Sequence, residues 1–310
     1  MTSIPPSLLL SVGTLAAPEI LRAPHRERIR FIDSIVAGGI DHVFIADHVS
    51  FHVGTGMDGL VNAATLTALN PSLKVVVGVY LLALRHPVTV ARQLATIAET
   101  APGQLVFGVG VGGEDRNEIA MCGVDPRTRG RRTDESLHVL RQLLDGEPVT
   151  HSGEFFSFER AWIQPAPQPS IPILIGGRAS AAMRRTALYG DGWLGIWCSP
   201  QRYAQALKEI ADQAAEVGRA APAYNGIQLW IGIDDDAVHA RARLAKGMER
   251  FYRIPFERFE KYSPYGTPAA IAEALARYRD AGCRVFNLMP VASDPEIGIA
   301  AVAEIKRLLG

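Results

Sequence analysis

The sequence predicts an α/β protein that folds as a single (β/α)8 barrel over residues 1–310, with insertions after the fourth helix and after the seventh strand. Three observations lead to this prediction. The chain has 310 residues, 48% of them hydrophobic, which is ample for one large barrel. Its strand candidates are short, nearly continuous apolar runs, as expected for parallel strands buried on both faces. Eight such runs alternate with helical patterns, which favours a closed barrel over a doubly wound sheet.

The predicted strands are apolar runs without a regular alternation of polar and apolar residues. No linker divides the chain between them, so we expect one domain. The eight runs cover residues 7–13, 42–47, 73–82, 104–111, 171–176, 192–197, 227–233 and 284–289.

Helical patterns lie between these strands. In 87–100 one face carries Val90, Leu94 and Ile97, and 267–281 has a similar apolar face. A capping residue before a proline marks several helix starts, because a side-chain oxygen satisfies free N–H groups and proline suits the first helical position. These starts are Ser199-Pro200, Thr267-Pro268, Asp294-Pro295 and, with a weaker cap, His86-Pro87.

Two segments exceed a minimal barrel. Residues 146–170 are expected to form a small hairpin followed by a proline-rich stretch. Because this segment follows a helix and precedes a strand, we expect it on the face opposite the active site, in a packing or oligomer contact. Residues 251–265 lie between two helices that both follow the seventh strand. Their six aromatic residues are equally compatible with a lid over the barrel and with the packing of an extra surface segment.

Composition argues against several classes of partner. Lys plus Arg equals Asp plus Glu, at 32 each, so a nucleic acid or an acidic membrane is not expected as the main partner. The three cysteines, Cys122, Cys198 and Cys283, show no metal-binding spacing and suit a reducing compartment. The first residues have no signal-peptide pattern, and no run is long enough to span a membrane. We therefore expect a cytoplasmic protein without a structural metal.

Candidate site residues follow from the rule that barrel enzymes place their chemistry at the C-terminal ends of the strands. After the fifth strand, Gly176-Gly177-Arg178-Ala179 leads directly into a helix, where free N–H groups and an arginine suit a cofactor phosphate. Asp47-His48 follows the second strand and fits a catalytic acid–base pair, metal ligands or a structural turn. Metal ligation is the least favoured of these, because no further ligands converge there. A serine hydrolase is not expected, because the chain has no GxSxG motif.

A series of motifs along the whole chain resembles the luciferase-like monooxygenase superfamily. Single motifs are weakly specific, but their order and spacing are strongly so. In chain order they are Phe44 to His48, Leu82 to Pro87, Gly108 to Gly112 with Asn117-Glu118, Arg129-Gly130, Gly153 to Phe156, Ile175 to Gly177, Gly190 to Trp193 and Gly266 to Pro268.

The resemblance implies a cofactor, either FMN or the deazaflavin coenzyme F420. Its ring would lie against a bulge in the third strand with a non-proline cis peptide, here Gly78-Val79. The run Gly113-Glu114-x-x-Asn117-Glu118 is similar to the loop of deazaflavin-dependent sugar-phosphate dehydrogenases. It departs from that loop by one extra glycine, and a tryptophan usual after the Asp-His pair is absent from 49–57, which puts a sugar-phosphate substrate in doubt.

The resemblance therefore predicts a coenzyme F420-dependent oxidoreductase that transfers a hydride to or from a small organic substrate. The alternative is an FMN-dependent monooxygenase that uses oxygen and reduced flavin, supplied by a reductase partner or by NAD(P)H. A non-catalytic flavin-binding protein on the same scaffold is a third possibility. We also expect a homodimer. The predicted catalytic residues are His48 and Glu114, and the predicted cofactor-binding residues are Asp47, Gly78, Val79, Gly110, Gly112, Asn117, Gly176, Gly177, Arg178 and Ala179.

Overall fold

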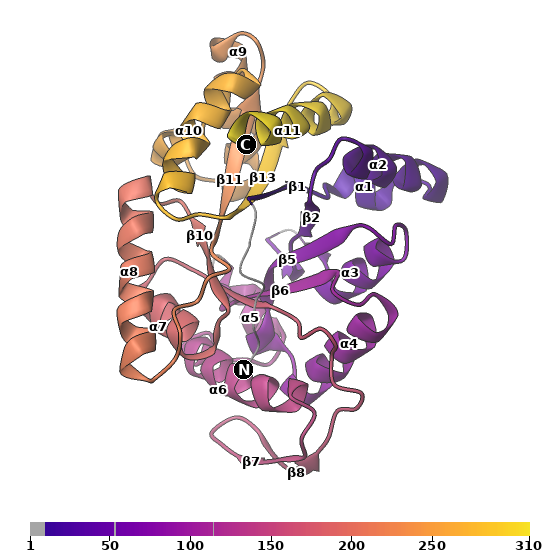
Figure 1. Ribbon diagram of the computed structural model, residues 1–310, viewed down its shortest axis with the longest axis vertical. Coiled ribbons are helices and arrows are strands. Elements are labelled where there is room, and N and C mark those ends of the chain that lie inside the picture. Colours follow the sequence, from indigo (N-terminus) through magenta and orange to yellow (C-terminus); the bar gives the residue numbers. More distant parts are fainter. Residues whose placement is uncertain (1–9, 53, 114) are drawn as a thin grey trace.

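The structure, a computed structural model, describes residues 10–52, 54–113 and 115–310. Eight parallel strands form a closed barrel in the order β1-β2-β5-β6-β9-β10-β11-β13, and β13 pairs with β1 to close it. The helices surround the barrel, with α3 and α4 on one side and α7 and α8 on the other (Figure 1). This arrangement confirms the predicted (β/α)8 barrel.

Each predicted strand overlaps one strand of the barrel. The largest difference is at β1, which begins at Ser11 rather than at residue 7; residues 7–9 lie outside the described residues. The barrel strands are β1 (Ser11–Leu15), β2 (His42–Ile45), β5 (Lys74–Leu81), β6 (Leu105–Gly110), β9 (Ile173–Gly176), β10 (Gly192–Ile196), β11 (Gly226–Ile233) and β13 (Val285–Val291).

The helices start where the capping residues predict. Ser199 accepts a hydrogen bond from the Arg202 N–H, Thr267 from Ala270 and Asp294 from Glu296. The helices are α1 (Pro18–Arg22), α2 (His25–Ala37), α3 (Gly59–Thr67), α4 (Pro87–Thr100), α5 (Arg116–Met121), α6 (Arg129–Leu144), α7 (Ser180–Tyr189), α8 (Pro200–Glu216), α9 (Ala237–Tyr252), α10 (Pro268–Asp280) and α11 (Pro295–Leu309).

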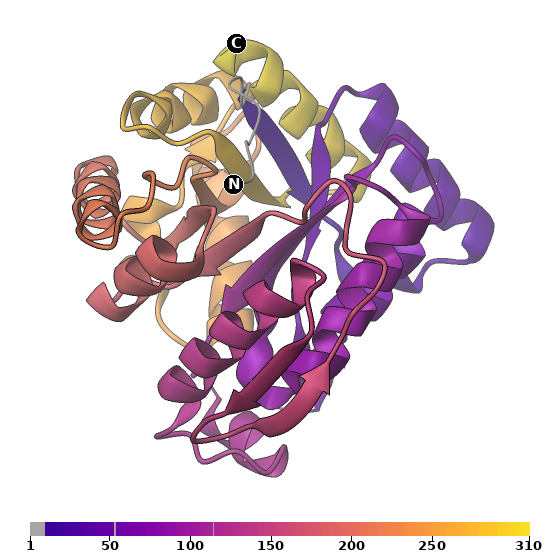
Figure 2. The same cartoon turned by 60° about the horizontal axis from the view of Figure 1, so that its bottom comes forward.

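The insertion after α6 is the predicted hairpin, made of β7 (Val149–Ser152) and β8 (Ser157–Ala161). Only the part of the insertion next to the end of α6 lies on the face opposite the active site, as predicted. The tip runs back along the outside of the barrel, beside α6 and α4 (Figure 2). There, Glu135 of α6 accepts hydrogen bonds from the N–H groups of Phe155 and Phe156, and the Phe156 ring lies 5.1 Å from the His86 ring at the start of α4. Through these contacts the insertion packs against the outer helices of the barrel.

A second hairpin, which the sequence did not predict, follows β2. It pairs β3 (His48–Phe51) with β4 (Thr55–Met57). The short strand β12 (Tyr265–Gly266) extends the sheet next to β11.

The middle of the segment 251–265 packs against α9. Phe256 and Phe259, in and after the 3₁₀ turn Phe256–Arg258, are buried against Leu244 and Met248 of α9. A second 3₁₀ turn covers Glu260–Tyr262. This part of the segment therefore follows the packing alternative.

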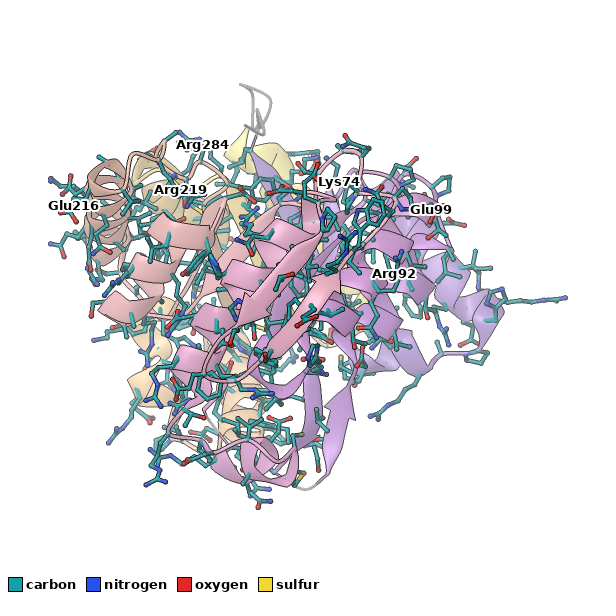
Figure 3. The ribbon with its side chains drawn as sticks, turned by 90° about the horizontal axis from the view of Figure 1, so that it is seen from below. Lys74, Arg92, Glu99, Glu216, Arg219 and Arg284 are labelled. Carbon is teal, nitrogen blue, oxygen red and sulfur yellow. The ribbon has the colours of Figure 1, made fainter. Side chains whose placement is uncertain are left out.

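Basic side chains lie at one end of the barrel, and the predicted site lies at the other. Lys74 and Arg284, at the beginnings of β5 and β13, lie with Arg219 at the N-terminal end of the strands (Figure 3). The loops at the other end, after the strands, carry the predicted site. No helix among the described residues has the length and apolar character needed to cross a membrane.

The buried carboxylate of Asp47 holds the site end of β2 in place. It accepts hydrogen bonds from the N–H groups of Gly59, which begins α3, and Leu81, which ends β5, both at 2.9 Å. The Arg85 guanidinium donates two more, at 2.6 and 2.8 Å. The Asp47 side chain is 0% exposed, so its charge is balanced by this bidentate pair and the two N–H groups.

A polar chain lies inside the barrel below the site. The His42 ring bonds the Ser11 hydroxyl through Nδ1 at 2.9 Å and the Asn287 side chain through Nε2 at 2.8 Å. Burial lowers the pKa of His42 to about 4, although the bond to Asn287 opposes the change. The ring is therefore neutral in the folded protein at neutral pH.

We expect the free energy of unfolding to fall as pH decreases from about 6.5 to about 4, because the unfolded chain takes up a proton at His42 that the folded chain resists. The difference between these two pKa values corresponds to roughly 3 kcal/mol. Urea unfolding across this range should give a steeper pH dependence for the wild type than for His42→Gln. His25→Gln, at an exposed position, is the control and should keep the wild-type slope. Equal slopes for all three proteins would contradict this role.

Asp47→Asn should destabilise the protein by about 3 to 5 kcal/mol, because it leaves the largely buried Arg85 guanidinium with only its longer contact to Asp58, at 3.3 Å. Urea unfolding measures the change. Asp125→Asn, which disrupts the exposed pair of Asp125 and Arg127, is the matched control and should have little effect. If both substitutions had the same small effect, Asp47 would not hold this end of the barrel together.

Candidate active site

The described candidate residues all lie in the C-terminal halves of neighbouring barrel strands or just beyond them. Asp47 and His48 follow β2, Gly78 and Val79 lie in the second half of β5, and Gly110 ends β6. Gly112 and Asn117 follow β6, Gly176 ends β9, and Gly177 to Ala179 follow it. Because β2, β5, β6 and β9 are adjacent in the sheet, these residues form one continuous arc.

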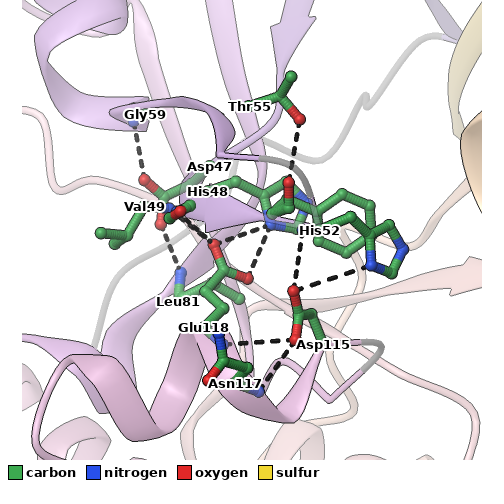
Figure 4. Close-up of polar contacts among 12 residues, drawn as sticks. Asp47, His48, Val49, His52, Thr55, Gly59, Leu81, Asp115, Asn117 and Glu118 are labelled. Carbon is green, nitrogen blue, oxygen red and sulfur yellow. Dashed lines mark hydrogen bonds and ion pairs between the residues drawn. The ribbon is translucent and has the colours of Figure 1, made fainter.

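His48 is oriented by a carboxylate that the sequence prediction did not include. Its Nδ1 lies 3.0 Å from Oε2 of Glu118, on α5 (Figure 4). The same carboxylate accepts hydrogen bonds from the N–H groups of Val49, at 2.7 Å, and Ser50, at 3.1 Å. Glu118 thus fixes both the imidazole and the strand β3 that carries it.

Glu118 is buried but ionised. Burial alone would raise the pKa of its carboxyl group, but the hydrogen bonds from His48 and from the backbone of Ser50 and Val49 outweigh burial and lower it. With a carboxylate accepting from Nδ1, the other ring nitrogen of His48, Nε2, is the atom that can gain or release a proton. The Asn117-Glu118 pair was part of the sequence resemblance, but nothing in the sequence connects Glu118 to His48, 70 residues away.

A second acidic residue, Asp115, fixes the other end of the hairpin. It accepts a hydrogen bond from the His52 N–H at 2.8 Å and caps α5 through the N–H groups of Asn117 and Glu118. The bond from His52, together with the capping bonds, lowers the pKa of the Asp115 carboxyl group. Asn117 is exposed in the first turn of α5.

The predicted irregularity in β5 is present. The Gly78-Val79 peptide is cis, and the register with β6 shifts between Val77 and Tyr80. The Val79 side chain lies over Gly110 and Gly176, where a Cβ atom would collide with it. These two glycines therefore make room for the bulge of β5.

The loop after β6 requires glycine at two positions. Gly112 and Gly113 have φ angles of 67° and 135°, which disfavour other residues. The Gly112 carbonyl accepts a hydrogen bond from Nε of Arg129, the first residue of α6. Glu114, the second predicted catalytic residue, lies outside the described residues.

The predicted phosphate site combines an uncapped helix and an unpaired cation. Helix α7 begins at Ser180 with no side chain capping its first turn, and residues 178–181 are exposed. The Arg178 guanidinium lies 5.1 Å from the centre of the Trp197 ring, and has no carboxylate partner in the described part of the chain. Gly177 has a φ of 122° and bonds the Trp193 indole N–H through its carbonyl. Helix N–H groups and an arginine are groups that bind anions.

A cavity of about 690 Å³ opens beside this arc, at the ends of β1, β2, β11 and β13. His48 forms part of its wall. Much of the rest is apolar and includes Phe51 of the hairpin, Trp230 of β11 and Phe251 of α9. Phe251 thus places the start of segment 251–265 over the barrel mouth. Among the described residues, no group of three or more His, Cys, Asp or Glu side chains is arranged to hold a metal ion.

Relatives in sequence include a coenzyme F420 enzyme. The chain is 33% identical over 162 residues to the F420-dependent glucose-6-phosphate dehydrogenase of Nakamurella multipartita, a match that covers 50% of this chain and 48% of the relative. Another relative is an uncharacterised protein of Mycobacterium tuberculosis, of which the match covers 57%. The chain thus spans about half the length of the curated relatives that it matches first.

Solved structures share the whole fold. An F420-dependent secondary alcohol dehydrogenase in complex with an F420-acetone adduct superimposes with a TM-score of 0.85 at 18% identity, over 97% of this chain and 99% of the other. The oxygenating constituent of 3,6-diketocamphane monooxygenase from Pseudomonas putida, in complex with FMN, gives a TM-score of 0.76 at 15% identity, over 97% and 98%. At these identities the likeness concerns the fold alone.

The family model described as luciferase-like monooxygenase matches residues 11–284, which is most of the chain. This match includes every strand from β1 to β12 and every predicted site residue. The chain is therefore a member of the luciferase-like monooxygenase family, whose enzymes are oxidoreductases.

Proposed function

We propose that this chain is a coenzyme F420-dependent oxidoreductase that transfers a hydride between the deazaflavin and a small organic substrate. The observation that carries the proposal is His48, held by Glu118 at the end of β2, at the wall of an apolar cavity and on the same barrel face as the Gly78-Val79 bulge. The relative and the solved dehydrogenase that use F420 support the choice of cofactor.

The described residues fit a phosphate-bearing, ring-containing cofactor. The bulge of β5 lies at the barrel mouth with Val79 half-buried, and its side chain fills the space that Gly110 and Gly176 leave open. The α7 N-terminus offers N–H groups for a phosphate, and Arg178 offers a cation that has no carboxylate partner among the described residues. In this proposal Gly78 and Val79 support the ring, and Gly110, Gly112 and Asn117 border it. The phosphate is held by Gly176, Gly177, Arg178 and Ala179. Asp47 holds the strand ends beneath the cofactor in place through its hydrogen bonds.

When bound, the deazaflavin supplies a ring carbon that accepts or donates a hydride. Removing a hydride from a carbon that bears a hydroxyl group also requires removal of the hydroxyl proton. His48 takes up this proton at Nε2, while ionised Glu118 stabilises the charged imidazole through Nδ1. In the reverse direction His48 returns the proton. Glu114 remains in the proposal as a second acid–base group because of the family resemblance.

The second candidate function is an FMN-dependent monooxygenase. It is favoured by the description of the family and by the structural likeness to an FMN-bound monooxygenase component. That function would need a reductase partner or NAD(P)H to supply reduced flavin. Under either function the homodimer and the cytoplasmic location remain predictions.

We expect F420 to bind with a micromolar dissociation constant or tighter, and FMN at least tenfold more weakly, a difference of roughly 1.4 kcal/mol. Absorbance titration of the purified chain with each cofactor measures both constants. Arg178→Ala should weaken both, because each cofactor carries a phosphate. It is a cleaner variant than one at Gly177, where a side chain would meet the Cβ of Ala182 in a strained backbone conformation. Tighter binding of FMN would reverse the ranking and favour the monooxygenase.

His48→Gln should leave cofactor binding and the fold largely intact but slow hydride transfer by about 10² to 10⁴. Glu118→Gln should have a smaller effect on rate, because it removes the group that orients His48 rather than the group that moves the proton. These rates are measured as single-turnover absorbance changes of the deazaflavin, with a substrate found by screening alcohols and carbonyl compounds. Glu114→Gln is tested in the same assay. His25→Gln, at an exposed position that does not line the cavity, is the control. A near-normal rate in the His48→Gln variant would show that His48 has a structural role and does not transfer the proton.

A further inference from the structure

We propose that the cavity beside His48 takes an apolar, ring-bearing substrate that carries a negatively charged group, such as a carboxylate, held by Arg250 and Arg253. This inference rests on the proposed function, because it names the substrate class for the same site. It draws on three features of the described residues: an aromatic wall, the balance of charge around the cavity and the backbone at Arg253.

The aromatic wall extends from His48 to the end of α9. The Phe51 ring lies 4.3 Å from the His48 ring and 5.7 Å from the Phe251 ring, whose plane is inclined to it by 29°. Trp230 lies 5.8 Å from Phe251, and its indole N–H bonds the Tyr252 hydroxyl, so it does not offer that donor to a ligand. Phe251 is 41% exposed, a large apolar side chain at the cavity mouth. Such a surface suits a flat apolar ligand.

The charges around the cavity are unbalanced at one end. Its charged lining residues, apart from histidines, are Glu19, Arg22, Arg250, Arg253 and Asp294. Glu19 and Arg22 stand three residues apart on α1 and add no net charge. The Asp294 carboxylate caps α11 through the Glu296 N–H at 2.7 Å.

Arg250 and Arg253, on either side of Phe251, are the cations without compensation. Within the part of the chain that the structure describes, neither has a carboxylate partner. Some arginines elsewhere do contact carboxylates, as Arg141, Arg185 and Arg241 do at 2.8, 2.5 and 2.6 Å. The α9 end of the cavity is therefore suited to an anion.

The backbone at Arg253 is a third, independent observation. Arg253 ends α9 in the left-handed conformation, with a φ of 56°. Glycine or asparagine is usual at this helix end, and other residues adopt the conformation at a cost. The conformation itself gives no reason for an arginine, whereas a role for its guanidinium at the cavity does.

These features also orient the ligand. His48 is at one end of the aromatic wall, and the two arginines are at the other. The carbon to be oxidised or reduced therefore lies next to His48, the ring lies along Phe51 and Phe251, and the anionic group points away from the barrel. The ring of the ligand therefore lies between the reacting end at His48 and the charged end beyond Phe251.

The test compares two probes of equal shape, 2-naphthoate and neutral 2-naphthamide, by isothermal titration calorimetry on the full chain, with and without saturating F420. We expect naphthoate to bind at least tenfold more tightly. Arg250→Ala and Arg253→Ala should each reduce this preference, and the double variant should abolish it. Arg253→Ala keeps a Cβ atom at the strained position, so the fold should be unaffected, as measured by thermal unfolding.

Two further variants separate charge from shape. Arg258→Ala removes an exposed arginine that does not line the cavity and should preserve the preference. Phe251→Ala should weaken both probes by a similar factor of several fold, because it removes a shared aromatic contact. If neither probe binds, if both bind equally, or if the double arginine variant keeps the preference, the inference is wrong.

The outcome is distinguishable from failure of the proposed function. Tighter binding of FMN than of F420, with the naphthoate preference intact, would contradict the choice of cofactor and support the anionic substrate class. Binding of F420 without any naphthoate preference would contradict the substrate class alone.

Discussion

The buried carboxylate of Asp47 is the interaction on which the geometry of the site depends. It joins the end of β2 to the start of α3 and the end of β5, and it pairs with Arg85 ahead of α4. The next residue in the chain is His48, so the direction in which the imidazole leaves the barrel is set by a group that is itself 0% exposed. A buried ionised group has little freedom, because each displaced donor would leave charge uncompensated.

Glu118 is the second buried carboxylate that holds the site together, and it contacts the residues that follow Asp47. It holds His48 and the backbone of β3 together, so the hairpin after β2 is joined to helix α5 after β6. The bulge at Gly78-Val79 adds a steric constraint on the same side. Val79 needs the space that Gly110 and Gly176 leave open, which links β5 to both of its downstream neighbours. The glycines of the family motifs thus serve the protein's own packing as well as any ligand.

This fold does not fix one activity. The same barrel, at TM-scores of 0.85 and 0.76, occurs in an F420-dependent secondary alcohol dehydrogenase and in a monooxygenase component in complex with FMN. The barrel supplies a common platform at the ends of β2, β5, β6 and β9, whereas the hairpin after β2 and the end of α9 shape the cavity beside it. Differences in chemistry are therefore expected in these loops rather than in the barrel.

The sequence by itself determined the eight strands, the helix starts and the family, because local apolar patterns, capping residues and motif spacing are properties of short segments. The position of the cis peptide was implied by the family resemblance rather than by any local pattern. It also placed His48 at a strand end. Only the tertiary structure decided that Glu118 orients His48, that Asp47 is buried under Arg85, and that the tip of the 146–170 insertion returns along α6 to reach His86. The cavity of Phe51, Trp230 and Phe251 likewise combines three elements far apart in the chain. Contacts between distant segments depend on how the closed barrel brings its strand ends together, and no local pattern records them.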